Sequence, residues 1–305
     1  MIDGWQQVTG AVAFIGLLTI VLVKLSKRSI SHDLRARDVT KGHHWCYTGM
    51  FSQPSYCNIC ETLIMTSDGA FCGACGVCAD QPDCITASNS DFHCKEITTT
   101  GSNLRHHWIE GNLPLGAVCD VCEEECGTEL GLSDLRCCWC QGCCHTNCVK
   151  KLSEICDLGQ VKKFVVPPNN IKVNTGRIRK HLVIKEVISP SISNWCPVIV
   201  IGNCTSGSYE AEYVLSSFRK VLNPAQVVDL SQKSPEEALE WCHLLQDVTC
   251  RVIVAGGDGT VGWVFNTIFK LKLKNTPLVS ILPLGTGNDL SRVLGWGESH
   301  SGSIC

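Results

Sequence analysis

The sequence lacks a marked excess of either charge. Its 305 residues carry 26 Lys and Arg against 29 Asp and Glu, a formal net charge of −3 at pH 7. Nothing in this balance indicates a nucleic-acid partner, and we expect none. The length is enough for two or three domains, and one of them can have a sizeable core.

Charged residues are missing from one stretch, Gly4–Val23, which is mostly apolar and long enough to span a bilayer as a helix. No basic region precedes it, which argues against a cleaved signal peptide, and Lys24, Lys27 and Arg28 follow it. Because basic flanks stay on the cytosolic side, we expect a transmembrane helix at 4–25, with the rest of the chain in the cytosol near anionic lipids. A buried core helix or a re-entrant membrane segment is the alternative.

Cysteine is abundant: the chain has 23, most of them between Cys46 and Cys156. In a reducing compartment, such residues indicate zinc sites rather than disulfides. The second half of this block has a regular spacing of eight ligand-type residues. They are His106-x12-Cys119-x2-Cys122-x14-Cys137-x2-Cys140-x4-His145-x2-Cys148-x7-Cys156. Eight ligands make two tetrahedral sites, and so small a segment with little apolar content needs metal to fold, so we predict two zinc ions here.

The first half of the block repeats this spacing in a degraded form. Its predicted ligands are His44, Cys57, Cys60, Cys72, Cys75, Cys84 and Cys94. The second histidine is missing, and Asp80 or Cys78 stands near its place, so the fourth ligand of one site stays open and we expect one or two zinc ions. The remaining histidines and cysteines, including His43 and Cys46, are interpreted as bystanders.

Both halves resemble C1 domains, the zinc fingers of the protein kinase C type that bind phorbol esters and diacylglycerol. The resemblance implies two zinc-stapled modules at 43–95 and 105–156. It also implies interleaved ligands in the second module: His106, Cys137, Cys140 and Cys156 for one ion, and Cys119, Cys122, His145 and Cys148 for the other. Apolar loop tips would allow diacylglycerol capture, and a structural or protein-docking role is the alternative.

After a stretch at 157–195 that looks like a linker or edge elements, the pattern changes to alternating strands and helices. Strands are expected at Val198–Ile201, Gln226–Asp229, Arg251–Ala255 and Leu278–Leu282, and helices at Tyr209–Leu222, Ser234–Gln246 and from Thr260. This alternation predicts an α/β fold with a parallel, doubly wound sheet, which binds its ligand at the carboxyl ends of the strands.

Three strand ends carry glycine-rich or polar turns, at Asn203–Gly207, Gly256–Thr260 and Pro283–Asp289. The second turn lacks the Gly-Lys-Ser/Thr of a Walker A loop and is not a GxGxxG fingerprint. Gathered at one edge, the three turns would make a phosphate-binding cleft. Asp258 could then hold Mg²⁺ or take a proton from an attacking hydroxyl, although a simple helix cap would also explain it.

The last two turns carry the most specific resemblance of the chain. Gly256-Gly257-Asp258-Gly259-Thr260-Val-Gly-Trp-Val, Leu282-Pro-Leu-Gly-Thr-Gly-Asn-Asp-Leu290 and Leu294-Gly-Trp-Gly297 closely resemble the catalytic region of eukaryotic diacylglycerol kinases. The order of a hydrophobic segment, two C1-like units and kinase motifs is similar to the epsilon type of that family.

This resemblance implies transfer of the ATP γ-phosphate to diacylglycerol, making phosphatidic acid, with Mg²⁺. It implies a catalytic Asp258 and nucleotide contacts from Asn203, Ser206, Gly207, Gly256, Gly257, Gly259, Thr260, Gly285, Thr286, Gly287, Asn288 and Asp289. Residues 196–305 would be the N-terminal part of the catalytic domain, since the family continues into a second, β-rich domain. The alternative is a truncated, inactive isoform that acts as a zinc-dependent membrane adaptor.

Overall fold

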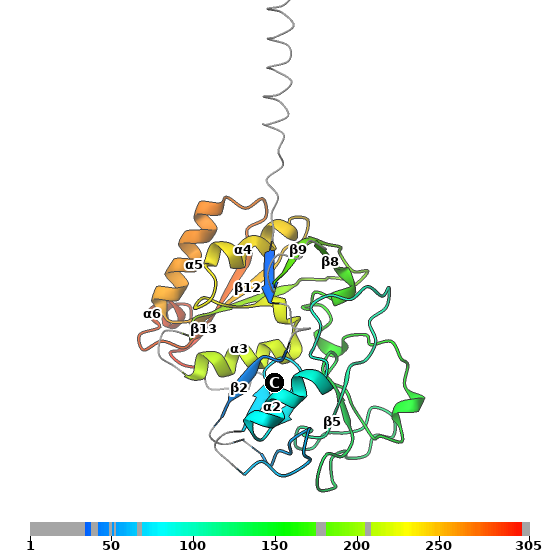
Figure 1. Cartoon of the computed structure of the whole chain (residues 1–305). Helices are drawn as coiled ribbons and strands as arrows, with labels where there is room; N and C mark the ends of the chain where they lie inside the picture. Colours follow the sequence, from blue (N-terminus) through cyan, green and yellow to red (C-terminus); the bar gives the residue numbers. More distant parts are fainter. Residues whose placement is uncertain are drawn as a thin grey trace, which may run out of the picture. The chain divides into compact units, whose positions relative to one another are not determined.

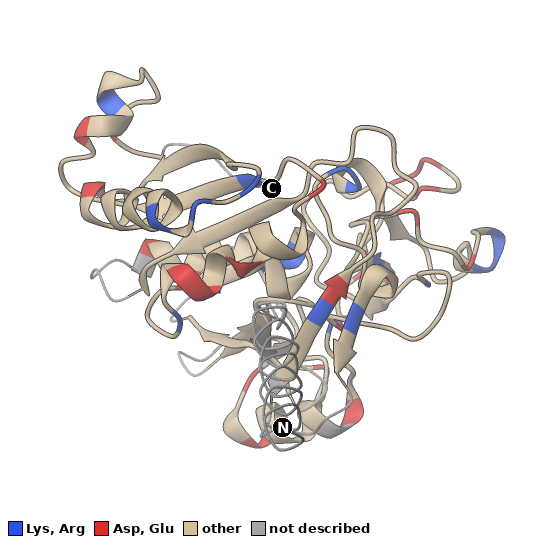
Figure 2. Cartoon of the chain, turned by 90° about the horizontal axis from the view of Figure 1, so that it is seen from above, with Lys and Arg blue, Asp and Glu red and all other residues tan. Residues whose placement is uncertain are grey.

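The structure is a computed structural model, which describes residues 34–37, 42–48, 51, 53–65, 69–174, 181–204 and 209–300 (Figure 1). Among these residues, no helix is both long and apolar enough to cross a bilayer. The membrane helix predicted at 4–25 lies outside the described residues. Acidic and basic residues are interspersed along the chain in the view of Figure 2, in line with the small net charge.

A four-stranded sheet forms the centre of the C-terminal part. Its order is β11-β10-β12-β13, with bounds Val227–Asp229, Val198–Gly202, Arg251–Gly256 and Leu278–Pro283. Each neighbouring pair is parallel, and the register pairs Gly202 with both Asp229 and Ala255, and Gly256 with Pro283. The carboxyl ends of all four strands therefore lie along one edge, which confirms the predicted parallel α/β sheet.

The three helices between these strands follow the predicted order: α3 (Tyr209–Val221), α4 (Pro235–Leu244) and α5 (Asp258–Leu271). A short helix that was not predicted, α6 (Asp289–Val293), follows β13. Helix α4 begins with a capping box, in which the Ser234 side chain accepts the Glu237 N–H and the Glu237 carboxylate accepts the Ser234 N–H. Helix α5 begins two residues earlier than predicted, so Asp258 is its first residue.

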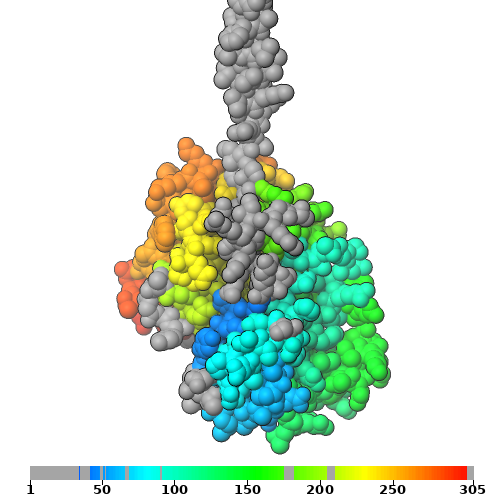
Figure 3. Space-filling view, viewed as in Figure 1, coloured from blue at the N-terminus to red at the C-terminus, as the bar shows by residue number. Residues whose placement is uncertain are grey.

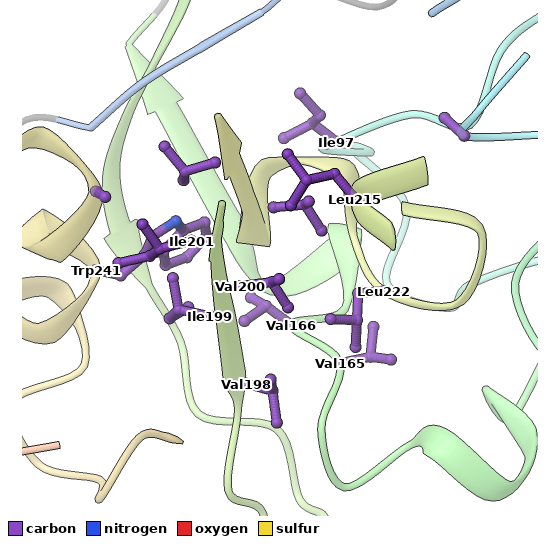
Figure 4. Close-up of a cluster of buried hydrophobic side chains, with 14 of the residues drawn as sticks. Ile97, Val165, Val166, Val198, Ile199, Val200, Ile201, Leu215, Leu222 and Trp241 are labelled. Atoms are coloured by element: carbon purple, nitrogen blue, oxygen red, sulfur yellow. The ribbon is translucent and has the colours of Figure 1, made fainter. Parts of the chain in front are cut away.

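Strand β10 is buried on both faces because helices cover both sides of the sheet. All five of its residues are buried. In Figure 4, Ile199 and Ile201 lie on the side of Trp241 from α4, whereas Val200 lies on the side of Leu215 from α3. Because neither face of β10 meets water, its sequence is a continuous apolar run rather than an alternation of apolar and polar residues.

The segment 157–195, predicted to be a linker or edge elements, contributes to the core instead. Within it, β8 (Ile171–Asn174) and β9 (His181–Val187) pair with β1 (Leu34–Arg37) in an antiparallel sheet of order β1-β9-β8. Val165 and Val166 are completely buried.

Short 3₁₀ turns lie at Val149–Lys151, Gly159–Val161, Pro168–Asn170 and Pro224–Gln226.

The cysteine-rich block folds into two similar modules. The first has an antiparallel sheet of β2 (Trp45–Tyr47), β3 (Ala70–Cys72) and β4 (Cys78–Ala79), followed by helix α2 (Pro82–Asp91). The second has β5 (Trp108–Glu110), β6 (Leu135–Cys137) and β7 (Cys143–Cys144) in the same order. Equivalent residues pair in both, since Trp45 lies opposite Cys72 and Trp108 opposite Cys137. The block is therefore an internal repeat, as its spacing predicted.

Candidate active site and metal centres

The loops that follow β12 and β13 touch each other through two glycines. A methyl group at Gly285 would lie 2.6 Å from the Cα atom of Gly257, and one at Gly257 would lie 3.1 Å from the Cα atom of Gly285. The Leu284 N–H also donates to the Gly256 carbonyl oxygen at 3.3 Å. These two glycine-rich turns, predicted to share a cleft, therefore form one continuous surface at the carboxyl edge of the sheet.

Asn288 holds the second of these turns in its bent shape. It is buried and has a positive φ of 53°, a conformation that asparagine tolerates better than most residues. Its Oδ1 accepts the Gly285 N–H at 3.0 Å, and its Nδ2 donates to the carbonyl oxygens of Gly285 and Glu298, both at 2.7 Å. The predicted nucleotide contact thus uses its amide side chain to shape the loop.

Asp258 belongs to the turn after β12, and its exposed side chain reaches the turn after β13. Its Oδ2 accepts the Asp289 N–H at 2.9 Å, and its Oδ1 accepts the Leu290 N–H at 3.1 Å. These backbone N–H groups lower the pKa of the Asp258 carboxyl below its ordinary value. The side chain therefore caps α6 rather than its own helix, and it remains ionised. Each carboxylate oxygen keeps a further lone pair that can bind a cation.

The amino end of α5 is open to an anionic ligand. Its N-cap residue, Gly257, provides no side-chain hydrogen bond to the first turn. A methyl group at Gly259 would meet no atom within 4 Å, whereas Thr260 is buried and its side chain packs against Gly256. A helix end of this kind presents N–H groups that suit a phosphate.

The third predicted turn lies at the end of β10, next to the loop after β12. Asn203 belongs to it, whereas Ser206 and Gly207 lie outside the described residues. Sequence reasoning missed Asp229, which ends the neighbouring strand β11 and is buried. Its Oδ1 accepts the N–H groups of Cys204 at 3.3 Å and Ser231 at 2.9 Å, so it shapes this turn. An acid that ends an apolar strand was the signal available in the sequence.

The second zinc finger gathers its eight predicted ligands into two groups. His106, Cys137, Cys140 and Cys156 form one, and Cys119, Cys122, His145 and Cys148 the other, with the ligand atoms of each group within 4.8 Å of one another. This grouping agrees with the interleaved pairing that the C1 resemblance implies. Four nitrogen and sulfur donors at such separations fit tetrahedral zinc.

The charge state of the second group also favours a metal. Burial opposes ionisation of Cys119, but backbone N–H groups of His145, Cys122 and Val121 lower the pKa of its thiol to about 5. Thiolate is the form of cysteine that binds zinc. The His145 Nε2 lies 3.2 Å from the Glu125 carbonyl oxygen, a partner that leaves Nδ1 for the metal.

In the first finger, the prediction of His44 as a ligand is wrong, because the structure uses His43. The group is His43, Cys72, Cys75 and Cys94, with 3.3 Å between His43 Nδ1 and Cys75 Sγ. The sequence favoured His44 because its twelve-residue gap to Cys57 equals the gap between His106 and Cys119. The better guide is the tryptophan two positions after the ligand, because the ring of His43 lies 5.2 Å from that of Trp45, as His106 stacks on Trp108.

The other group of the first finger contains three thiols, from Cys57, Cys60 and Cys84. Cys84 lies on α2, whereas the second finger has a short 3₁₀ turn, Val149–Lys151, after its last strand. Cys78, one of the two residues considered for the fourth position, instead directs its buried thiol to the Gly76 carbonyl oxygen at 3.6 Å. Asp80, the other candidate for the fourth position, stays a prediction.

Comparison with known proteins bears on both halves of the chain. The family model described as "Phorbol esters/diacylglycerol binding domain (C1 domain)" matches residues 106–159. The family model described as "Diacylglycerol kinase catalytic domain" matches residues 197–304, which contain both glycine-rich turns and Asp258.

Several curated relatives share most of this chain. Diacylglycerol kinase eta of Drosophila mojavensis is 33% identical over 299 residues, covering 94% of this chain and 15% of the relative. Diacylglycerol kinase delta of Mus musculus is 37% identical over 270 residues, covering 84% of this chain and 21% of the relative. The chain thus spans only about a fifth or less of these relatives. These are eta and delta types, so the likeness to the epsilon type stays a prediction. Residues 197–304 thus match the diacylglycerol kinase catalytic domain, residues 106–159 match the C1 domain, and most of the chain is similar to diacylglycerol kinases.

Proposed function

We propose that this chain takes part in ATP-dependent phosphorylation of diacylglycerol to phosphatidic acid in lipid signalling. One observation carries the proposal: two glycine-rich turns and an ionised Asp258 come together at the carboxyl edge of a parallel sheet. Parallel sheets of this kind bind their ligands at that edge. The catalytic-domain match to residues 197–304 supports the assignment of the ligand as nucleotide.

The residues of this site suit binding and positioning more than covalent chemistry. Backbone N–H groups at the start of α5 and in the turn after β13 would hold the phosphates, and the Gly257–Gly285 contact leaves no side chain in the way. Mg²⁺, when bound, would offset phosphate charge in a site whose turns carry no Lys or Arg. The lowered pKa of Asp258 weakens it as a base, so we assign it to cation binding rather than to hydroxyl activation.

The two fingers would serve as zinc-dependent lipid-binding modules. We propose two zinc ions in the second finger and one or two in the first, in the groups described above. Exposed apolar side chains, including Met65 in the first finger and Leu115 and Leu130 in the second, are available for diacylglycerol and anionic lipids. We accordingly propose a membrane-associated protein whose fingers and catalytic part face the cytosol.

The proposal is tested by measuring radiolabelled phosphatidic acid from the zinc-loaded full chain, Mg²⁺, labelled ATP and vesicles containing diacylglycerol. Asp258→Asn should lower the rate roughly 10²-fold or more. Asp247→Asn is the matched control, because that exposed acid pairs with Lys274. Equal rates in the two variants would contradict the role of Asp258. No product even from the unaltered chain would contradict catalysis by this polypeptide and favour the adaptor function.

A further inference from the structure

The Glu212 side chain lies where the first finger meets the catalytic part. It belongs to the first turn of α3. Its Oε2 accepts a hydrogen bond from the Cys204 thiol at 3.2 Å, and Cys204 follows Asn203, a predicted nucleotide contact, at the end of β10. Its Oε1 lies 3.1 Å from Nε2 of His44 and 3.5 Å from the thiol of Cys46, both in the first finger. One carboxylate thus contacts the start of the nucleotide turn and the finger.

A cation from the same helix holds this carboxylate in place. Arg219 lies about two turns further along α3 and is buried on the same face as Glu212. Its Nη1 donates to Glu212 Oε1 at 3.1 Å and lies 3.0 Å from His44 Nε2. Burial alone would raise the pKa of Glu212, but the contact with His44 and the charge of Arg219 lower it to about 2. Figure 3 shows this junction, with the blue residues of the first finger beside the yellow-green residues of the catalytic part.

Cys204 is held at two points. Its backbone N–H donates to Oδ1 of Asp229 at 3.3 Å, and its thiol donates to Glu212. Burial, together with these two carboxylates, raises the pKa of the Cys204 thiol above its ordinary value, so the thiol keeps the proton that it donates. The main chain is therefore fixed from β11 and the side chain from α3. A turn that is fixed before its ligand arrives loses less conformational freedom on binding.

We propose that Glu212 is a positioning residue for the nucleotide turn and couples this turn to the first finger. It acts through Cys204 on one side and through His44 on the other. The inference rests on the nucleotide site proposed above and adds a means of regulating it. Because coupling between two sites is reciprocal, a finger that stabilises the turn is itself stabilised by bound nucleotide.

The first measurement is the affinity of the zinc-loaded full chain for Mg²⁺–ATP, by titration calorimetry. Cys204→Ala and His44→Ala should each lower this affinity about 2- to 30-fold, the range found for residues that couple distant sites. Cys204→Ser should restore most of it, because a serine hydroxyl can also donate to Glu212. Cys196→Ala is the matched control, since this half-buried thiol before β10 contacts the Thr249 carbonyl oxygen instead and should leave the affinity unchanged.

Hydrogen exchange of the segment 198–204, measured without nucleotide, tests the restraint separately from ligand binding. Its amides should exchange faster in Cys204→Ala and Glu212→Ala, and at the unaltered rate in Cys204→Ser. Glu210→Ala is the matched control, because Glu210 is an exposed acid in the same helical turn. It should leave the exchange unchanged.

Unchanged exchange at 198–204 in Cys204→Ala and Glu212→Ala would overturn the proposal. An equal effect of Cys204→Ser and Cys204→Ala would also overturn it, because the effect would then not depend on a donor to Glu212. If the unaltered chain binds no Mg²⁺–ATP, the function proposed above fails, and the exchange data alone decide whether Glu212 positions the turn.

His44→Ala tests the coupling to the finger. Native mass spectrometry should find the same number of zinc ions in this variant as in the unaltered chain, since His43 rather than His44 lies in the zinc group. Weaker Mg²⁺–ATP binding or faster exchange at 198–204, with an unchanged zinc count, supports the coupling. Unchanged binding and exchange contradict it, and so does a lower zinc count, which would assign the effect to loss of metal.

Discussion

The contact between Gly257 and Gly285 gives the sharpest test of how the site is built. In Gly285→Ala, the new methyl group would lie 2.6 Å from a backbone atom, whereas ordinary contacts begin at 3.4 Å. One turn must therefore move by about 0.8 Å, the difference of these two distances. Strain of this kind costs about 1–3 kcal/mol. The movement would also weaken the hydrogen bonds of Asp258 to Asp289 and Leu290.

Hydrogen exchange of the segment 284–294 measures this strain directly. A loss of about 1–3 kcal/mol in the free energy of local opening makes exchange roughly 5- to 150-fold faster. Affinity for Mg²⁺ and ATP, measured by titration calorimetry, should fall in the same variant. Gly262→Ala is the matched control, because a methyl group there meets no atom within 4 Å and the residue lies inside α5. That change should stabilise the helix by about 0.5–1 kcal/mol.

The outcome that refutes this reasoning is unchanged exchange at 284–294 in Gly285→Ala. The two turns would then not share the close contact described here, and the site would not depend on it. Faster exchange in both alanine variants would also count against it, because it would show a general effect of adding a methyl group rather than a specific clash.

Three further predictions follow from single contacts. His106→Ala should remove one zinc ion from the second finger, whereas His107→Ala should remove none, as counted by native mass spectrometry. Gln226→Leu should lower the free energy of unfolding by about 2–5 kcal/mol in urea denaturation, because four backbone partners of this buried side chain lose their hydrogen bonds, whereas the exposed Gln246→Leu should change little. The lowered pKa of Asp258 keeps its carboxylate ionised even at pH values near the ordinary pKa of an aspartate, so the difference in Mg²⁺–ATP affinity between the unaltered chain and Asp258→Asn should stay constant from about pH 8 to pH 5, although protonation of ATP itself weakens both. A difference that disappears around pH 6 would contradict this.

The strands and helices of the catalytic part could be predicted because local patterns decide them. The apolar run of β10 and the Ser-Pro-Glu-Glu start of α4 both appear in the structure where the sequence placed them. The start of α5 was missed by two residues, because glycines there give no propensity signal and the helix begins on Asp258. Two helical phenylalanines, Phe265 and Phe269, are exposed, although they fall on the same repeat as buried Val261.

The parts that could not be predicted depend on contacts distant in sequence. No local pattern in 157–195 shows that this segment packs into the core. Its position depends on the pairing of β9 with β1 and on the Gln226 side chain, which donates both to Phe164 in the segment and to Val198 in β10. The choice between His43 and His44 depends on which ring the fold of the first finger turns inward. Spacing counts residues along the chain, whereas ligation depends on which of the two side chains before β2 points into the finger, and this is the buried His43.

Helix α3 connects these observations, because both modules of the cysteine-rich block contact it. The Nζ of buried Lys95 donates to the Lys220 carbonyl oxygen at 2.7 Å, and the Gln141 side chain of the second finger donates to the same oxygen at 3.0 Å. At the other end, Glu212 contacts His44 of the first finger. Carbonyls in the last turn of a helix have no partner within it, so these donors satisfy groups that water would otherwise bind. A displacement of either finger must therefore disturb the helix that follows the turn after β10, and through it one side of the candidate nucleotide site.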